Sequence, residues 1–213
     1  MIPEQPITLV SGPDLSLEAL LALPPSPPAG VVICHPHPLY GGDMDNPVVI
    51  RVQEVCASLG LATLRFNFRG VGASGGVHGG GVGEQDDAAA ALDALAKAIG
   101  GSTLVIAGYS FGSRIAALVG SRDSRVGGIA LIAPPLAMSD FGFLGDVRVP
   151  TLAVAGTRDQ YCPPDEFARF TAARPWIKAA TIDGADHFFF GKLFPLGEAV
   201  TEWAQRLPRG PAR

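Results

Sequence analysis

The sequence is poor in the features that mark several large classes of protein. It has only three cysteines, Cys34, Cys56 and Cys162, without a close pair, so we expect neither a disulfide framework nor a zinc site. No run of about 18 apolar residues occurs, so no membrane span is predicted. The first five residues contain neither a basic nor an apolar segment. We therefore expect no secretory signal and a reduced, cytoplasmic protein.

Charge is also scarce and nearly balanced. Charged residues make up 17% of the chain, and 20 acidic against 16 basic residues give a net charge of −4. No basic stripe is present, which argues against a nucleic-acid partner. Hydrophobic residues make up 47% of the 213 residues, and this length and composition suit one globular domain over 1–213. The oligomeric state stays open, a homodimer included.

Short apolar segments rich in β-branched residues alternate with longer amphipathic segments. The predicted strands cover residues 7–10, 15–21, 31–34, 62–66, 103–107, 128–132, 151–155 and 179–182. The predicted helices cover residues 47–59, 84–99, 110–120, 164–173 and 196–207. The alternation predicts an α/β fold with a mostly parallel eight-stranded sheet and helices on both faces. The first two strands are joined by too short a connection for a crossover, so they should form an antiparallel hairpin.

The strongest functional signal is the pentapeptide GYSFG at 108–112, which lies between a predicted buried strand and a predicted helix. A serine exposed at the top of a sheet needs a very tight strand-to-helix turn. Flanking glycines remove the Cβ clashes that such a turn creates. The pentapeptide alone is a weak signal, but its place between strand and helix favours Ser110 as a nucleophile.

A nucleophilic serine needs a base and a group that orients this base. Of the four histidines, His187 comes shortly after the last predicted strand, and Asp159 follows the strand before it. Catalytic groups in open α/β sheets gather at such strand ends. Asp183 and Asp186 are rivals, but both are too close in sequence to His187 to approach its far ring nitrogen easily. We therefore expect Asp159 to orient His187.

These three residues, in this order and spacing, resemble the α/β-hydrolase superfamily. The segments HPHPLYGGDMDN at 35–46 and RFNFRGVGASG at 65–75 are similar to small lidless bacterial serine hydrolases near the dienelactone hydrolases, and the resemblance covers about residues 7–207. It implies the α/β-hydrolase fold and esterase activity through an acyl-enzyme, without a cofactor. Only residues 133–150 lie where many superfamily members carry a lid, so we expect no cap domain and an open site.

The tetrahedral intermediate of such a reaction needs backbone N–H donors for its oxyanion. Phe111, directly after the nucleophile, would supply one at a helix N-terminus, where the helix dipole favours negative charge. The second donor is expected in the loop after the third predicted strand. Pro36 and Pro38 have no N–H, which leaves His37 or Leu39. The spacing of the superfamily favours Leu39.

The same loop contains further candidate residues. The resemblance implies that His37 and Tyr40 contact the substrate. His35 and His37 alternate along an extended chain and so face opposite ways, which makes them poor partners for one metal ion. We expect no metal site here, and one hydrogen-bonded core histidine that supports the loop. The polar residues after the fourth predicted strand are interpreted as anchors of their own loop: Asn67, Arg69 and Ser74.

The sequence thus predicts a serine hydrolase that cleaves carboxylic esters with small or short acyl groups. Thioester or peptide cleavage is an alternative on the same site, and so is acyl transfer to peroxide. A non-catalytic binding protein of the same fold is the alternative from another class. Candidates for all three catalytic positions are present, which argues against that last reading.

Overall fold

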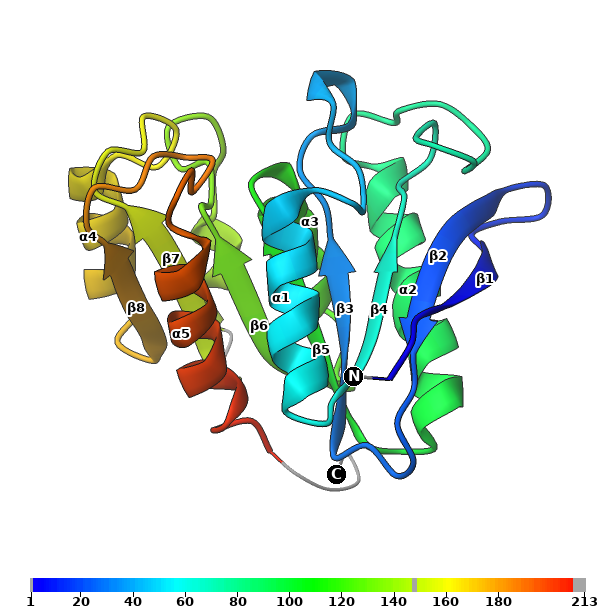
Figure 1. Ribbon diagram of the computed structural model, residues 1–213. Helices are drawn as coiled ribbons and strands as arrows, with labels where there is room; N and C mark the ends of the chain where they lie inside the picture. The colour runs from blue at the N-terminus through cyan, green and yellow to red at the C-terminus, as the bar shows by residue number, and fades with distance from the viewer. Residues whose placement is uncertain (1, 147–148, 209–213) are drawn as a thin grey trace.

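A single eight-stranded sheet forms the centre of the computed structural model, which describes residues 2–146 and 149–208 (Figure 1). The strands are β1 (Gln5–Val10), β2 (Ser16–Ala22), β3 (Ala29–Cys34), β4 (Ala62–Phe66), β5 (Thr103–Tyr109), β6 (Val126–Ile132), β7 (Thr151–Gly156) and β8 (Ile177–Ile182). Their order in the sheet is β1-β2-β4-β3-β5-β6-β7-β8. Strands β3 to β8 pair in parallel, whereas β2 is antiparallel to both β1 and β4. The predicted parallel sheet with an antiparallel N-terminal hairpin is confirmed.

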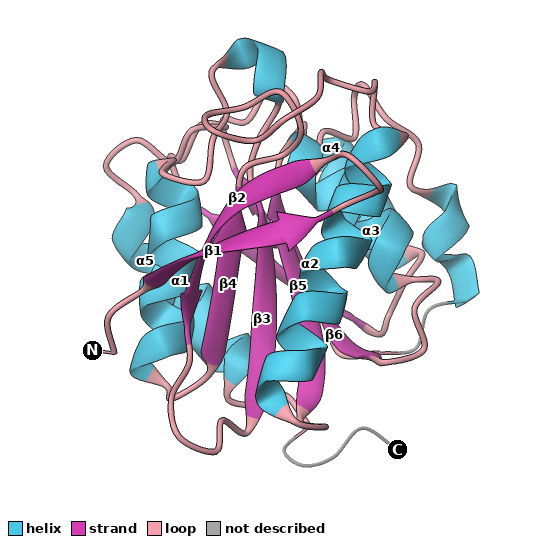
Figure 2. Cartoon of the chain, turned by 90° about the vertical axis from the view of Figure 1, so that its right-hand side faces the viewer, coloured by secondary structure: helices cyan, strands magenta, loops and turns pink. Residues whose placement is uncertain are grey.

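Helices cover both faces of the sheet, as Figure 2 shows from the side. They are α1 (Pro47–Ser58), α2 (Gly83–Ile99), α3 (Phe111–Gly120), α4 (Pro164–Ala172) and α5 (Leu193–Ala204). Apolar side chains of α1 and α5 pack on one face, and those of α2, α3 and α4 pack on the other. Because both faces are covered, every residue of β3, β4, β5 and β7 is buried. This explains why β3, β5 and β7 are largely apolar, whereas β4 also buries Thr63 and Arg65.

Helix α5 begins earlier than the sequence suggested. The prediction placed its start at residue 196, directly after Pro195, but the helix begins at Leu193. Pro195 therefore lies in the first turn, where its missing N–H would have no helical acceptor in any case. At α1 the predicted start is confirmed, since Pro47 is the first helical residue and the Asn46 side chain accepts the Val48 N–H at 2.9 Å.

The connection between β6 and β7 is short. Its described part contains one 3-10 helix, Gly142–Asp146, and no cap domain. No helix among residues 2–146 and 149–208 combines the length and the apolar character needed to cross a membrane. All three cysteines are buried, and burial raises the pKa of each thiol. These thiols are therefore core side chains.

Candidate active site

Ser110 occupies the turn between β5 and α3, at the carboxyl edge of the sheet. Its backbone is strained, with φ 54° and ψ −119°, a conformation that residues with a Cβ rarely adopt. The neighbouring glycines make this turn sterically feasible. A Cβ at Gly108 would lie 2.1 Å from the Gly112 carbonyl oxygen, and one at Gly112 would lie 2.4 Å from the Cys34 carbonyl oxygen. Glycine is thus required at both positions, as the pentapeptide suggested.

The Ser110 side chain starts a chain of hydrogen bonds between three loops. His187 Nε2 lies 2.9 Å from Ser110 Oγ, although the two residues are 77 positions apart. On the other side of the ring, His187 Nδ1 lies 2.9 and 3.0 Å from the two carboxylate oxygens of Asp159. The structure thus brings together the three side chains that the sequence selected.

Asp159 is held firmly in its position. Its side chain is fully buried, and Oδ1 accepts the backbone N–H groups of Tyr161 and Cys162 at 2.8 and 2.9 Å. Two N–H groups and an imidazole thus give this buried side chain hydrogen-bond partners. The rival carboxylates lie elsewhere: Asp186 accepts the N–H of Phe188 at 3.0 Å, and Asp183 accepts the Thr157 hydroxyl at 3.3 Å.

The loop after β3 lies directly against the start of α3. His35 is fully buried in it, and its ring bonds the Pro36 carbonyl at 2.6 Å and the Phe68 N–H at 3.0 Å. This pattern requires a neutral ring protonated at Nδ1. Burial accordingly lowers the pKa of His35 to about 4. His35 is the supporting core histidine that the sequence predicted.

His37 faces the other way, toward the edge of the site. Its ring centroid lies 4.9 Å from that of Phe111 and 4.7 Å from that of Tyr40. Its Nδ1 accepts the N–H of Leu39 at 3.2 Å, so the N–H that the sequence favoured as second oxyanion donor is already bonded. For the His37 N–H, the structure records no acceptor in residues 2–146 and 149–208.

The chain is similar to known proteins over most of its length. The alpha/beta hydrolase domain family matches residues 29–193. The chain belongs to the α/β-hydrolase family. It is 35% identical to an uncharacterized protein of Rickettsia prowazekii (strain Madrid E) over 204 residues, which cover 91% of this chain and 86% of that protein.

Two solved α/β-hydrolase structures are similar along almost the whole chain. An α/β serine hydrolase without a lid from Xanthomonas campestris is 30% identical, with a TM-score of 0.87, and the alignment covers 99% of this chain and 98% of that chain. An α/β serine hydrolase homologue from Coxiella burnetii is 34% identical, with a TM-score of 0.86, and the alignment covers 93% and 96%. The α/β-hydrolase fold without a lid, expected from the motifs, is thus confirmed.

Some residues of this α/β-hydrolase site were not singled out from the sequence. Tyr109 precedes the nucleophile, and its hydroxyl donates to the His187 carbonyl oxygen at 3.0 Å. His78, from the glycine-rich loop before α2, places its ring 4.9 Å from that of His37, and its Nδ1 lies 2.7 Å from buried Glu84. The GYSFG motif contains Tyr109, but nothing in its sequence context predicts the partner of the hydroxyl.

The polar residues after β4 are anchors, as predicted. Arg69 forms an ion pair with buried Asp87, in which Arg69 Nη2 lies 2.7 Å from Asp87 Oδ1. Asn67 accepts the Met44 N–H at 2.8 Å, and Ser74 donates to the Asn67 carbonyl at 2.7 Å. These bonds hold the loop after β4 in place. They account for the three polar residues without assigning them a catalytic role.

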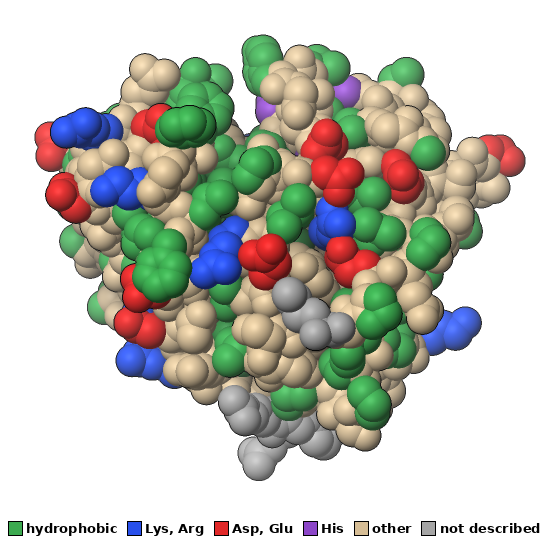
Figure 3. Space-filling model, in the orientation of Figure 1, with side chains coloured by type: hydrophobic (Ala, Val, Ile, Leu, Met, Phe, Trp, Pro, Cys, Tyr) green, Lys and Arg blue, Asp and Glu red, His purple; other side chains and the backbone are tan. Residues whose placement is uncertain are grey.

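Exposed apolar side chains surround the candidate site. They lie in loops that follow β3, β4, β6 and β8: Leu39, Tyr40, Val77, Val82, Met138, Phe188 and Phe190. Figure 3 shows hydrophobic and histidine side chains together at the upper edge of the molecule, where these loops lie in Figure 1. In the segment 188–190 after the base, Phe188 and Phe190 are exposed, whereas Phe189 is fully buried in the core.

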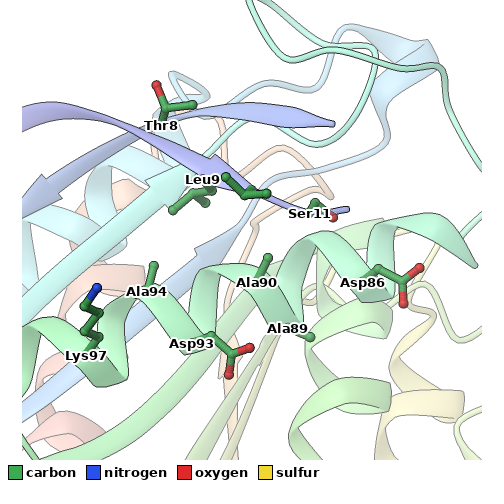
Figure 4. A pocket seen from close by; sticks show the side chains of 10 residues that line it. Thr8, Leu9, Ser11, Asp86, Ala89, Ala90, Asp93, Ala94 and Lys97 are labelled. Atoms are coloured by element: carbon green, nitrogen blue, oxygen red, sulfur yellow. The ribbon is translucent and has the colours of Figure 1, made fainter. Parts of the chain in front are cut away.

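A cavity of about 430 Å³ lies well away from this site, between β1 and α2 (Figure 4). Its lining contains no histidine. Its hydroxyl side chains are Thr8 and Ser11, and that of Ser11 donates to Asp87 at 2.6 Å. Strand β1 is at the opposite edge of the sheet from β8. The cavity therefore lacks the groups that the reaction of an α/β-hydrolase needs.

Proposed function

We propose that this protein is a serine esterase that hydrolyses small carboxylic esters, with Ser110 as nucleophile, His187 as base and Asp159 as the residue that orients the base. The observation that carries the proposal is the continuous hydrogen-bonded chain from Ser110 Oγ through both ring nitrogens of His187 to Asp159. A carboxylate at Nδ1 keeps a proton on that nitrogen, so Nε2 is free to accept the serine proton.

The reaction proceeds in two acyl-transfer steps. Ser110 Oγ attacks the ester carbonyl carbon while His187 Nε2 takes the hydroxyl proton. The bond to the alcohol then breaks, and the leaving alcohol receives that proton from His187. Water attacks the resulting acyl-enzyme, gives a proton to His187, and Ser110 recovers it as the acid leaves. Asp159 stays ionised and stabilises the imidazolium that forms in both steps.

The oxyanion of each intermediate is bound by the backbone N–H groups of Phe111 and His37. Phe111 is the first residue of α3, so its N–H has no helical acceptor and lies at the positive end of the helix dipole. For the second donor we favour His37 over Leu39, because the Leu39 N–H is bonded to the His37 ring. The close contact of the β3 loop with Gly112 supports this pairing, since it holds the loop beside the start of α3.

The surroundings of Ser110 support an apolar substrate of modest size. The apolar side chains in the surrounding loops, with Tyr40 84% exposed, offer contact area but no enclosing cap among the described residues. We expect His37 and Tyr40 to contact the group that lies beside the oxyanion donors. An open site gives each additional methylene group little buried area, so small or short-acyl esters are the expected substrates.

Two measurements on the purified protein test this function. A fluorophosphonate probe should label one serine, Ser110, and p-nitrophenyl acetate should be hydrolysed by the wild type but not by Ser110→Ala. The Ser110→Ala variant should keep the wild-type circular dichroism spectrum. A protein that neither reacts with the probe nor cleaves any p-nitrophenyl ester would instead be a non-catalytic member of the family.

A further inference from the structure

Tyr109 connects the strand of the nucleophile to the turn of the base. Its side chain is buried at the end of β5, directly before Ser110, and its hydroxyl donates to the carbonyl oxygen of His187 at 3.0 Å. Burial, followed by the charges of Asp159 and Asp186, raises the pKa of Tyr109. The hydroxyl therefore stays protonated and remains a donor throughout the range in which an esterase works.

We propose that Tyr109 is a positioning residue, which fixes the distance between the His187 ring and Ser110 through this bond to the His187 backbone. The inference rests on the proposed function, because it assigns a role within that reaction. Ser110 follows β5 whereas His187 follows β8, and β6 and β7 lie between these two strands in the sheet. The relative position of nucleophile and base thus depends on contacts between two separate loops.

The turn that carries His187 needs such a restraint. Two residues after the base, Phe189 has a φ of 52°, an unfavourable value for a residue with a Cβ. The Asp186 carboxylate holds this turn from within by accepting the N–H groups of Phe188 and Phe190 at 3.0 and 3.3 Å. Tyr109 adds the bond that joins the turn to the strand of the nucleophile.

The contribution of the Tyr109 hydroxyl can be measured separately from that of its ring. The ring centroid lies 5.7 Å from that of His187 and 6.4 Å from that of Phe189, so Tyr109→Phe keeps these ring contacts and removes only the donor. Ser102→Ala is a matched control. Its hydroxyl donates to the Pro27 carbonyl oxygen at 2.8 Å, next to the opposite end of β5. Both variants thus lose a hydroxyl-to-carbonyl bond near the same strand.

The first experiment compares hydrolysis of p-nitrophenyl acetate by the wild type and the two variants. Tyr109→Phe should lower kcat about tenfold and change KM less than twofold, because small displacements of catalytic groups cost up to ~100-fold in rate. The rate of fluorophosphonate labelling at Ser110 should fall by a similar factor. Ser102→Ala should keep both rates, while each variant lowers the thermal midpoint by about 2–4 °C.

A double-mutant cycle with His187→Ala tests whether Tyr109 acts through the base. If it does, Tyr109→Phe should change the residual rate of His187→Ala by less than about twofold, since the group that it positions is absent. Equal kcat values in Tyr109→Phe and Ser102→Ala would overturn the positioning role and leave the esterase function intact. An undiminished tenfold effect in the His187→Ala background would also overturn it. A wild type without hydrolysis or labelling would overturn the function and this role together.

Discussion

Replacing Asp159 by Asn would test the proposed proton path with little change in shape. The Asn amide oxygen can take the place of Oδ1 and still accept the N–H groups of Tyr161 and Cys162, which lie at 2.8 and 2.9 Å. The amide NH₂ then faces His187 Nδ1, where a carboxylate oxygen lay at 2.9 Å. Two donors cannot share this contact, so the ring proton moves to Nε2. His187 then donates to Ser110 and cannot accept its proton.

The expected loss is about 10⁴-fold in kcat, or about 5 kcal/mol of transition-state stabilisation, by analogy with the same change in other triads. Asp186→Asn is the matched control, because its amide oxygen can still accept the N–H groups that Asp186 binds, and kcat should stay within about threefold of wild type. Turnover of p-nitrophenyl acetate by both variants gives the comparison, and circular dichroism confirms that both are folded. Near-wild-type activity of Asp159→Asn with loss in Asp186→Asn would refute the assignment.

Three further predictions concern acid stability, substrate size and backbone packing. The pKa of His35 falls from 6.5 to about 4 on folding, so the unfolded chain binds more protons between these values. The free energy of unfolding should therefore decrease by about 3 kcal/mol from pH 7 to pH 4, and urea titrations of His35→Gln should lose most of this decrease. With p-nitrophenyl esters of increasing length, kcat/KM should change by at most about fourfold per methylene group, whereas a sharp rise at the solubility limit of a long-chain ester would indicate a lid. Gly112→Ala should destabilise the fold by about 1–3 kcal/mol, because its Cβ would lie 2.4 Å from two carbonyl oxygens, while Gly145→Ala meets open space and should keep the wild-type thermal midpoint.

Most of the sheet could be predicted because burial on both faces leaves a direct signal in the sequence. The most apolar segments correspond to β3, β5 and β7. Strand β4 contains Thr63 and Arg65 and was still predicted with its observed bounds, Ala62–Phe66. The partners in the hydrogen-bonded chain could also be selected, since each lies in the loop or turn after a strand, at the same edge of the sheet. The start of α5 could not, because a proline in a first turn and a proline before a helix look alike in sequence.

Contacts that single side chains make between loops could not be predicted from the sequence. Tyr109 and His187 are 78 positions apart, and their bond depends on the course of the turn after β8. The meeting of His78 with His37 likewise depends on the path of a loop containing several glycines. Alternation did indicate that His35 and His37 face opposite ways, but packing against Phe68 decides that His35 is the buried one.

The hydrogen bonds of the loop after β3 bear on the proposed oxyanion donor. Its N–H groups at Tyr40 and Gly42 both donate to the His37 carbonyl at 3.1 Å, and that of Leu39 donates to the His37 ring. Pro36 and Pro38 have no N–H at all. The loop thus engages these donors with its own acceptors. Within residues 2–146 and 149–208 no acceptor is recorded for the His37 N–H, and we propose that it binds a ligand.

The backbone of His37 should therefore matter more for kcat than its side chain. The φ of His37 is −59°, which a proline ring adopts without strain. His37→Pro and His37→Ala both remove the imidazole and its bond to Leu39, but only His37→Pro also removes the N–H. Loss of one oxyanion donor costs about 100- to 1,000-fold in kcat, so His37→Pro should fall that far below His37→Ala on p-nitrophenyl acetate. Thermal midpoints within a few degrees of each other would show that both variants keep the loop. Equal kcat values in the two folded variants would mean that the second donor is another group, with Leu39, released from the imidazole, as the first to examine.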